Sequence, residues 1–186
     1  MQASVAPPET KLITGEELLA MGDIGPCELI DGRIVPMSPT GGKHGKIESI
    51  LSLALGLFAQ RHKSGSVMSG EVGIYTRRHP DRVRGADVVF MSNERAATPP
   101  EGFLEFAPEL VVEIISPSDR WSDMRRKIDE YFAIGIQWVW VIEPEDHAVL
   151  VYHSRTDMRE LTENDTLVGE GALEGFSLPV ASLFAA

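Results

Sequence analysis

The sequence predicts an α/β (α+β) fold in which helices flank a mixed β-sheet. Two apolar runs, ADVVFM (86–91) and ELVVEIIS (109–116), are nearly continuous, as is typical of central strands that are covered on both faces. Helical patterns stand before and after these runs, and further strand patterns follow, which fits helices on a mixed sheet better than a doubly wound parallel fold. The length of 186 residues, with 43% hydrophobic residues, suits one domain with a sizeable core.

The amino-terminal end is expected to be a tail followed by a short helix. Residues 1–11 read as a mobile tail, and residues 12–186 read as a single domain, because no repeat or long linker divides them. Thr14 and Glu17 have the spacing of a capping box, so the helix should begin at Thr14. Gly22 suits the left-handed residue that ends a helix.

A β-hairpin and a long helix are expected next. The strands CELI (27–30) and RIVPM (33–37) flank Asp31-Gly32, which is a strong signal for a type I′ turn. A loop then leads into a helix over about 44–63, which carries apolar residues on one face.

The remaining elements are predicted by the same periodicities. A strand is expected at 66–76, and a helix from about 122 to 134 should be closed by Gly135. The carboxyl end is expected to form a β-meander, with strands at 137–143, 147–153, 158–162 and 172–176.

Composition limits the function classes. The net charge of −11 argues against a general nucleic-acid coat protein, which would be basic, although the positive charges gather between residues 43 and 127. The lone Cys27 excludes an internal disulfide and a cysteine-cluster metal site. No apolar run approaches the roughly 20 residues of a membrane span, and the amino terminus has no secretory signal pattern. We therefore expect no membrane association and a cytoplasmic location.

Two carboxylates stand inside the apolar runs. Asp87 opens Val88–Phe90, and Glu113 shares a strand face with Val111 and Ile115. A charge in a buried strand is costly unless it is paired or bound to metal. Two acids on neighbouring strands offer the oxygen ligands that Mg²⁺ or Mn²⁺ prefers. The alternative, an ion pair or a solvated strand end, is a fair one for Asp87 and a weaker one for Glu113, which has apolar neighbours on both sides.

Lys127 is the third unexpected charge. It lies on the flank of an apolar helix stripe that includes Met124 and Tyr131. The ordinary interpretation is a lysine whose stem lies along the apolar edge while its ammonium stays in water. The alternative is a lysine that reaches a phosphate or a developing alkoxide.

His44 and Glu28 are the remaining candidates from the pattern. His44 lies on the apolar stripe of the long helix with Leu51 and Leu55, where a core or capping histidine is the ordinary interpretation. Glu28 falls on one face of the hairpin with Ile30, where a surface pairing is the ordinary interpretation. No role is assigned to Glu71 from its strand pattern.

Several segments, in this order and spacing, resemble the Uma-two (Uma2) family: CELIDGRIVPMSP, GKHGKIESIL, RGADVVFMS, APELVVEIISPSDR, RRKIDEYFAIGIQWVWVIEPE and AVLVYH. These are short bacterial restriction-endonuclease-like proteins of the PD-(D/E)XK nuclease superfamily. The resemblance covers nearly the whole chain, from about residue 12 to residue 184. It implies a restriction-endonuclease-like mixed central sheet flanked by helices, with an amino-terminal hairpin and a carboxyl-terminal meander.

The resemblance also implies site roles. Asp87 matches the first motif acid and Glu113 the acid of the second motif, and both would hold the metal. The motif lysine is expected two residues after Glu113, where Ile115 stands, and Lys127 matches a position to which this family has moved the lysine. His44 and Glu28 match polar positions that line the site. Ala86 replaces the usual proline and Cys27 a frequent tyrosine; neither change removes a metal ligand.

The resulting hypothesis is a Mg²⁺-dependent (or Mn²⁺-dependent) endonuclease that hydrolyses phosphodiester bonds of nucleic acid, with DNA as the expected substrate. Glu113→Ala or Lys127→Ala should abolish cleavage and leave the fold intact. The alternative is a catalytically silent nuclease fold that binds nucleic acid or a protein. A homodimer is also expected, because GIQWVWVIEP and the carboxyl-terminal meander offer apolar edges.

The sequence further offers arginines for phosphate contact, although solvated surface charge is the more common fate of such clusters. These are Arg77, Arg78, Arg82, Arg84, Arg120, Arg125 and Arg126.

Overall fold

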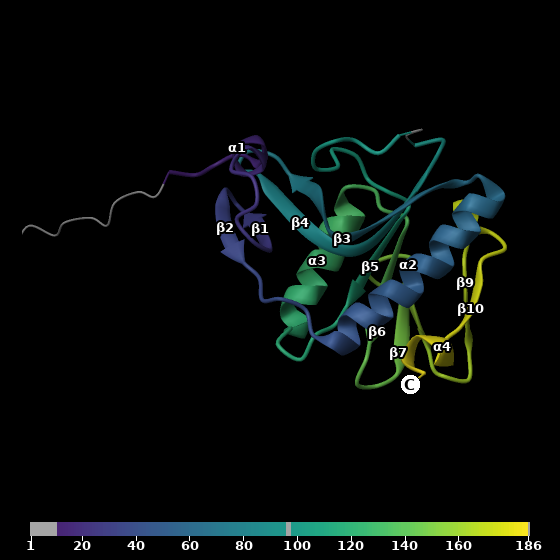
Figure 1. The fold of residues 1–186 in the computed structure, drawn as a ribbon. Coiled ribbons are helices and arrows are strands. Elements are labelled where there is room, and N and C mark those ends of the chain that lie inside the picture. Colours follow the sequence, from purple (N-terminus) through teal and green to yellow (C-terminus); the bar gives the residue numbers. More distant parts are fainter. Residues whose placement is uncertain (1–10, 96–97, 186) are drawn as a thin grey trace, which may run out of the picture.

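The structure is a computed structural model that describes residues 11–95 and 98–185 (Figure 1). The predicted tail therefore falls outside the described residues, apart from Lys11. The first elements are α1 (Gly15–Ala20), β1 (Cys27–Ile30), β2 (Arg33–Pro36), α2 (Gly42–His62), β3 (Gly65–Arg77) and β4 (Arg82–Ser92). The later elements are β5 (Leu110–Ile114), α3 (Trp121–Ala133), β6 (Trp138–Glu143), β7 (Ala148–Tyr152), β8 (Met158–Leu161), β9 (Thr166–Val168), the 3₁₀ turn η1 (Gly171–Leu173), β10 (Ser177–Pro179) and α4 (Ala181–Phe184).

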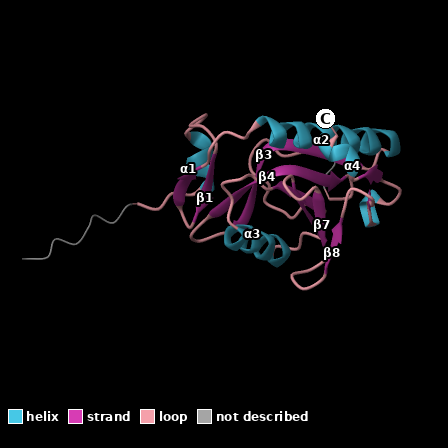
Figure 2. Ribbon diagram, turned by 90° about the horizontal axis from the view of Figure 1, so that it is seen from below, coloured by secondary structure: helices cyan, strands magenta, loops and turns pink. Residues whose placement is uncertain are grey.

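A mixed β-sheet forms the middle layer, with α2 on one face and α3 on the other (Figures 1 and 2). On the first face, Leu51 and Leu55 of α2 pack in one apolar cluster with Phe90 of β4. On the second face, Ile128 of α3 packs in another cluster with Val111 of β5. Both central strands are therefore covered on two sides, as their continuous apolar runs predict.

The sheet topology places the two candidate acids side by side. The described strands follow the order β2-β1-β4-β5-β6-β7-β8, and β3 pairs with β4. Among these pairings only β5 and β6 run parallel. The antiparallel register of β4 and β5 pairs Val88 with Val112, and one step further along it Asp87 stands opposite Glu113. The predicted fold class, a mixed sheet flanked by helices with a hairpin and a meander, is confirmed.

Local signals set the amino-terminal elements. The Thr14 side chain accepts a hydrogen bond from the Glu17 amide, and the Glu17 side chain accepts one from the Thr14 amide, so the predicted capping box is present. Asp31 and Gly32 have φ values of 55° and 74° between β1 and β2. That is the conformation that a type I′ turn requires.

The strand predicted at 172–176 is wrong. The structure has η1 there, and β9 pairs with β10 in a separate two-stranded sheet. Gly171 and Gly175 both have positive φ, which interrupts an extended chain. Leu173 and Phe176 are buried in the α2-side cluster at a spacing of three residues, as in a turn rather than in a strand.

The expected dimer edge also needs correction in part. The QWVWVIE segment forms β6, which is paired on one side with β5 and on the other with β7, so it offers no free edge. Within the described part of the meander, β8 is the terminal strand of the sheet order. No helix among the described residues has the length and apolar character needed to cross a membrane.

Candidate active site

A pocket of about 480 Å³ lies between the start of α2, the middle of β4 and the end of β5. Two loops, residues 36–41 and 116–119, complete its wall. Its charged lining residues are His44, Glu71, Asp87, Glu113, Asp119 and Lys127. Four of the five residues predicted for the site therefore line one pocket.

Asp87 is buried and hydrogen-bonded through both carboxylate oxygens. Its Oδ2 accepts a hydrogen bond from the Ile114 amide of β5 at 2.6 Å, and its Oδ1 lies 3.1 Å from His44 Nε2. Burial alone would lower the pKa of His44, but the Asp87 carboxylate outweighs burial and raises that pKa above its ordinary value. His44 thus acts as a partner of Asp87 rather than as a helix cap or an apolar core residue.

Glu113 is 3% exposed, and both of its carboxylate oxygens accept hydrogen bonds. The Tyr131 hydroxyl donates to its Oε1 at 2.5 Å, and the Lys127 ammonium donates to its Oε2 at 2.9 Å. Burial, together with the neighbouring Asp87 carboxylate, raises the pKa of Glu113 to about 7 against the opposing effect of Lys127. Negative charge at this point is therefore only partly neutralised by the protein.

Lys127 is not a lysine that reaches into water. Its ammonium contacts Glu113, the Gly85 carbonyl oxygen at 3.0 Å and Glu28 Oε1 at 3.1 Å. Burial alone would lower the pKa of Lys127, but the carboxylates of Glu113 and Glu28 raise it above its ordinary value. The ordinary interpretation of this lysine is therefore wrong, and the group stays an ammonium ion near neutral pH.

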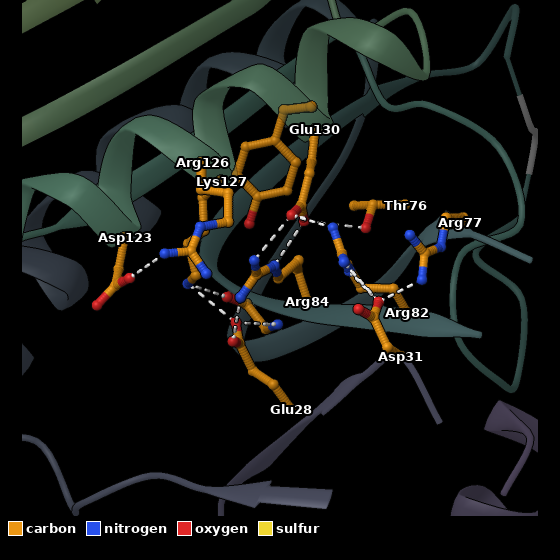
Figure 3. A network of polar contacts seen from close by, with 12 residues as sticks. Glu28, Asp31, Thr76, Arg77, Arg82, Arg84, Asp123, Arg126, Lys127 and Glu130 are labelled. Carbon is orange, nitrogen blue, oxygen red and sulfur yellow. Dashed lines mark hydrogen bonds and ion pairs between the residues drawn. The ribbon is translucent and has the colours of Figure 1, made fainter. Parts of the chain in front are cut away.

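Glu28 contacts the Lys127 ammonium but is not among the residues that line the pocket. It is buried, and its Oε1 accepts a hydrogen bond from the Gly85 amide at 3.1 Å. Its Oε2 accepts from Arg84 Nη1 at 2.8 Å. Figure 3 shows Glu28, Arg84 and Glu130 of α3 pointing toward one another, and Arg84 Nε donates to Glu130 Oε2 at 2.7 Å. Glu28 is thus a buried partner of two cations and not a surface residue of the hairpin.

Comparison with known proteins identifies the family and the fold of the chain. The model of the Uma2 family, described as "Putative restriction endonuclease", matches residues 16–181. The chain belongs to the Uma2 family. Among solved structures it resembles the crystal structure of "a putative nuclease belonging to DUF820 from Anabaena variabilis ATCC 29413". That match has a TM-score of 0.78 and 20% sequence identity, and it covers 93% of this chain and 98% of the other. At this identity the likeness establishes the fold alone. Among curated proteins, none matches the chain.

Most of the arginines proposed for phosphate contact have another use in this Uma2 protein. Arg77 and Arg82 both pair with Asp31, and Arg84 pairs with Glu28 and Glu130. Arg78 pairs with Glu16, Asp81 and Glu105, and Arg126 pairs with Asp123. The first arginine cluster therefore ties β3 and β4 to their neighbours and does not form a free cationic surface.

The structure adds residues to the site that pattern alone did not reveal. Tyr131 was expected only as part of the apolar stripe, yet its spacing of four residues from Lys127 places both side chains on one helix face, where both contact Glu113. Arg84 and Glu130 come from β4 and α3, and no sequence spacing connects them to Glu28. Glu71, which received no role, lines the pocket.

The pocket offers the donor chemistry of a hard cation. Its carboxylates, Glu71, Asp87, Glu113 and Asp119, are oxygen ligands of the kind that Mg²⁺ and Mn²⁺ take. Burial raises the pKa of both Glu71 and Glu113, and the Asp87 carboxylate raises both further against the opposing charge of Lys127. Within residues 11–95 and 98–185, no three His, Cys, Asp or Glu side chains are already gathered as a complete metal site.

Replacing Arg84 should strongly destabilise the protein. Arg84→Met removes the cation that the buried Glu28 and the partly buried Glu130 share, and breaking a buried ion pair from one side typically costs about 3–5 kcal/mol. Arg126→Met is the matched control, because its pair with Asp123 is exposed and should contribute less than about 1 kcal/mol. Urea unfolding measures both free energies. Equal effects of the two substitutions would show that the Arg84 network does not stabilise the fold.

Proposed function

We propose that this protein hydrolyses phosphodiester bonds of DNA with the help of a divalent cation, Mg²⁺ or Mn²⁺, held by Asp87 and Glu113. One observation carries the proposal: two buried carboxylates on adjacent strands and a partly buried ammonium meet at one pocket, with Lys127 Nζ 2.9 Å from Glu113. The family description as a restriction endonuclease supports nucleic acid as the substrate.

Each residue of the pocket has a separate role in this proposal. A divalent cation, when bound, would supply Lewis-acid chemistry by lowering the pKa of a water molecule and polarising the phosphate. Asp87 and Glu113 would hold it, while the Tyr131 hydroxyl fixes the orientation of Glu113. Lys127 stays protonated, so its role is to stabilise the negative charge that develops on the phosphate oxygens in the transition state.

Two further residues position these groups. His44 fixes Asp87 by a contact of 3.1 Å. Glu28 holds the Lys127 ammonium in place and is itself fixed by Arg84. We therefore assign His44 and Glu28 to positioning, and Lys127 to contact with the substrate phosphate.

Calorimetric titration with Mn²⁺ tests the metal assignment. Wild-type protein should bind the ion, and Asp87→Asn, which keeps the shape of the side chain, should lose most of that affinity. Asp123→Asn is the control, because Asp123 lies on the exposed side of α3 in a pair with Arg126. Plasmid nicking by the same three proteins should show the same pattern: wild type and Asp123→Asn should cleave, and Asp87→Asn should lose most of the activity. Unchanged Mn²⁺ affinity in Asp87→Asn would refute the assignment.

A catalytically silent, nucleic-acid-binding protein is the second candidate, and one observation favours it. Both oxygens of Asp87 and both oxygens of Glu113 already accept hydrogen bonds from protein groups or lie at that distance from them. In a silent site these contacts would persist and no cation would enter. Binding of a labelled oligonucleotide without any heat of Mn²⁺ binding would decide for this candidate.

A homodimer remains part of the proposal. Sedimentation equilibrium at several protein concentrations measures it directly.

A further inference from the structure

A β-bulge in β3 lies directly opposite Asp87. The register of β3 and β4 pairs Ser69 with Val88 and Val72 with Ala86, so Gly70 and Glu71 together face the single residue Asp87. Bulges of this kind re-aim a side chain and occur often beside active sites. The bulge therefore turns Glu71 out of the regular strand alternation and toward the pocket that it lines.

The bulge holds Glu71 in an unfavourable backbone conformation. Glu71 has a φ of 61°, in the left-handed region that a residue with a side chain rarely adopts. The Gly70 amide donates to Glu48 Oε1 of α2 at 3.0 Å, and this contact fixes the turn from outside. Strained residues that persist in a fold are concentrated at functional sites.

The Glu71 carboxylate is also left without a donor. Among the described residues, none donates a hydrogen bond to it or forms an ion pair with it. Space for it comes from Gly85, because a Cβ atom at that position would lie 2.7 Å from Glu71 Oε2. Burial raises the pKa of Glu71. The carboxylates of Asp87 and Glu28 raise this pKa further, and the charges of Lys127 and His44 lower it. A half-buried carboxylate in this setting is available to a ligand.

The other titratable groups of the pocket are engaged. The Lys127 ammonium already contacts Glu113, Glu28 and the Gly85 carbonyl oxygen, and it cannot take up a proton. His44 is paired with Asp87. Both oxygens of Glu113 accept hydrogen bonds. Asp119 Oδ2 accepts hydrogen bonds from the Ser116 amide and hydroxyl. Glu71 lines the pocket and, in the described part of the chain, its carboxylate has no hydrogen-bond or ion-pair partner.

We propose that Glu71 is a catalytic residue that accepts the proton of the attacking water, an inference that rests on the function proposed above. The water oxygen forms a bond to phosphorus while its proton passes to a Glu71 carboxylate oxygen. The bond from phosphorus to the leaving oxygen breaks, the leaving oxygen keeps the electron pair, and it takes a proton from a solvent water.

Glu71→Gln tests the assignment. General-base catalysis typically contributes about 10²–10⁴-fold, so cleavage should fall within that range while the Mn²⁺ affinity stays within about threefold of wild type. The melting temperature at pH 8 should rise, because an unpaired, partly buried charge is removed. Glu71→Asp should retain part of the rate, and the exposed Glu94→Gln should cleave like wild type.

The outcomes separate this inference from the proposed function. Glu71→Gln that cleaves within fivefold of wild type would overturn the role of Glu71 alone. A joint loss of cleavage and of Mn²⁺ affinity would overturn it as well, since Glu71 would then be a ligand. Wild-type protein that does not cleave with Mg²⁺ or Mn²⁺ would overturn both proposals.

Discussion

Glu113→Gln should abolish metal-dependent cleavage and make the protein more stable at pH 8. The amide keeps the shape of the carboxylate and can still accept the Tyr131 hydrogen bond, but it is a poor ligand for a hard cation. Cleavage should fall by at least about 10²-fold, the usual effect of losing one electrostatic group at a site. Thermal unfolding and plasmid nicking measure the two effects.

The gain in stability follows from the raised pKa of Glu113. Because the fold raises this pKa from 4.5 to about 7, ionised Glu113 destabilises the folded state. That destabilisation is absent below about pH 4.5, grows as the pH rises, and is complete above about pH 7, where 2.5 pKa units correspond to roughly 3 kcal/mol. The variant should therefore melt several degrees above wild type at pH 8 and at the same temperature near pH 4.5.

Glu109→Gln is the matched control. Glu109 is also buried, but the Ser92 and Arg95 hydrogen bonds outweigh burial and lower its pKa. Its ionised form therefore stabilises the fold above the unfolded pKa, and this contribution is lost as the pH falls through the folded pKa. The control should be less stable than wild type at pH 8 and should still cleave. If Glu113→Gln behaves like Glu109→Gln in stability, the pocket does not hold an uncompensated charge.

Lys127→Met should lose both cleavage and stability. The sequence alone suggests that replacing this lysine leaves the fold intact, but the ammonium lies between Glu113 and Glu28. Its removal leaves the buried Glu113 carboxylate without a cation, while Glu28 keeps Arg84, at a cost of roughly 3–5 kcal/mol. The rate of cleavage should fall by about 10²–10³-fold. Urea unfolding and nicking, measured below the unfolding transition, give the two values.

A double variant separates the two losses. In Lys127→Met/Glu113→Gln the uncompensated charge of Glu113 is gone, and Glu28 still pairs with Arg84, so most of the lost stability should return. Cleavage should stay absent, because neither the ligand nor the ammonium is present. Cleavage that returns together with stability would show that Lys127 acts only on the fold.

The sequence predicts the elements whose causes are local. The capping box of Thr14 and the Asp31-Gly32 turn need only neighbouring residues, and both are present. Asp87 and Glu113 could be found because each interrupts an apolar run, and an uncompensated charge in such a run is informative by itself. Lys127 could be found only with the family resemblance, since its helix position also fits a solvated lysine.

The rest of the site depends on long-range geometry. Arg84, Glu28 and Glu130 come from three separate elements, and their contact requires the sheet order and the placement of α3 (Figure 3). The orientation of Glu71 depends on a one-residue shift between β3 and β4. A strand pattern cannot show such a shift, because periodicity assumes a regular strand.

The parallel pairing of β5 with β6 has a consequence for how such proteins are recognised. It forces the chain to cross over the sheet through α3, and this crossover helix returns past Glu113, so an ammonium fourteen residues downstream reaches the acid. A text pattern that demands acid and lysine two positions apart would pass over this chain. A search by three-dimensional arrangement would retrieve it. Such a search would require two acids on adjacent strands and a cationic side chain that comes either from the strand or from the crossover helix.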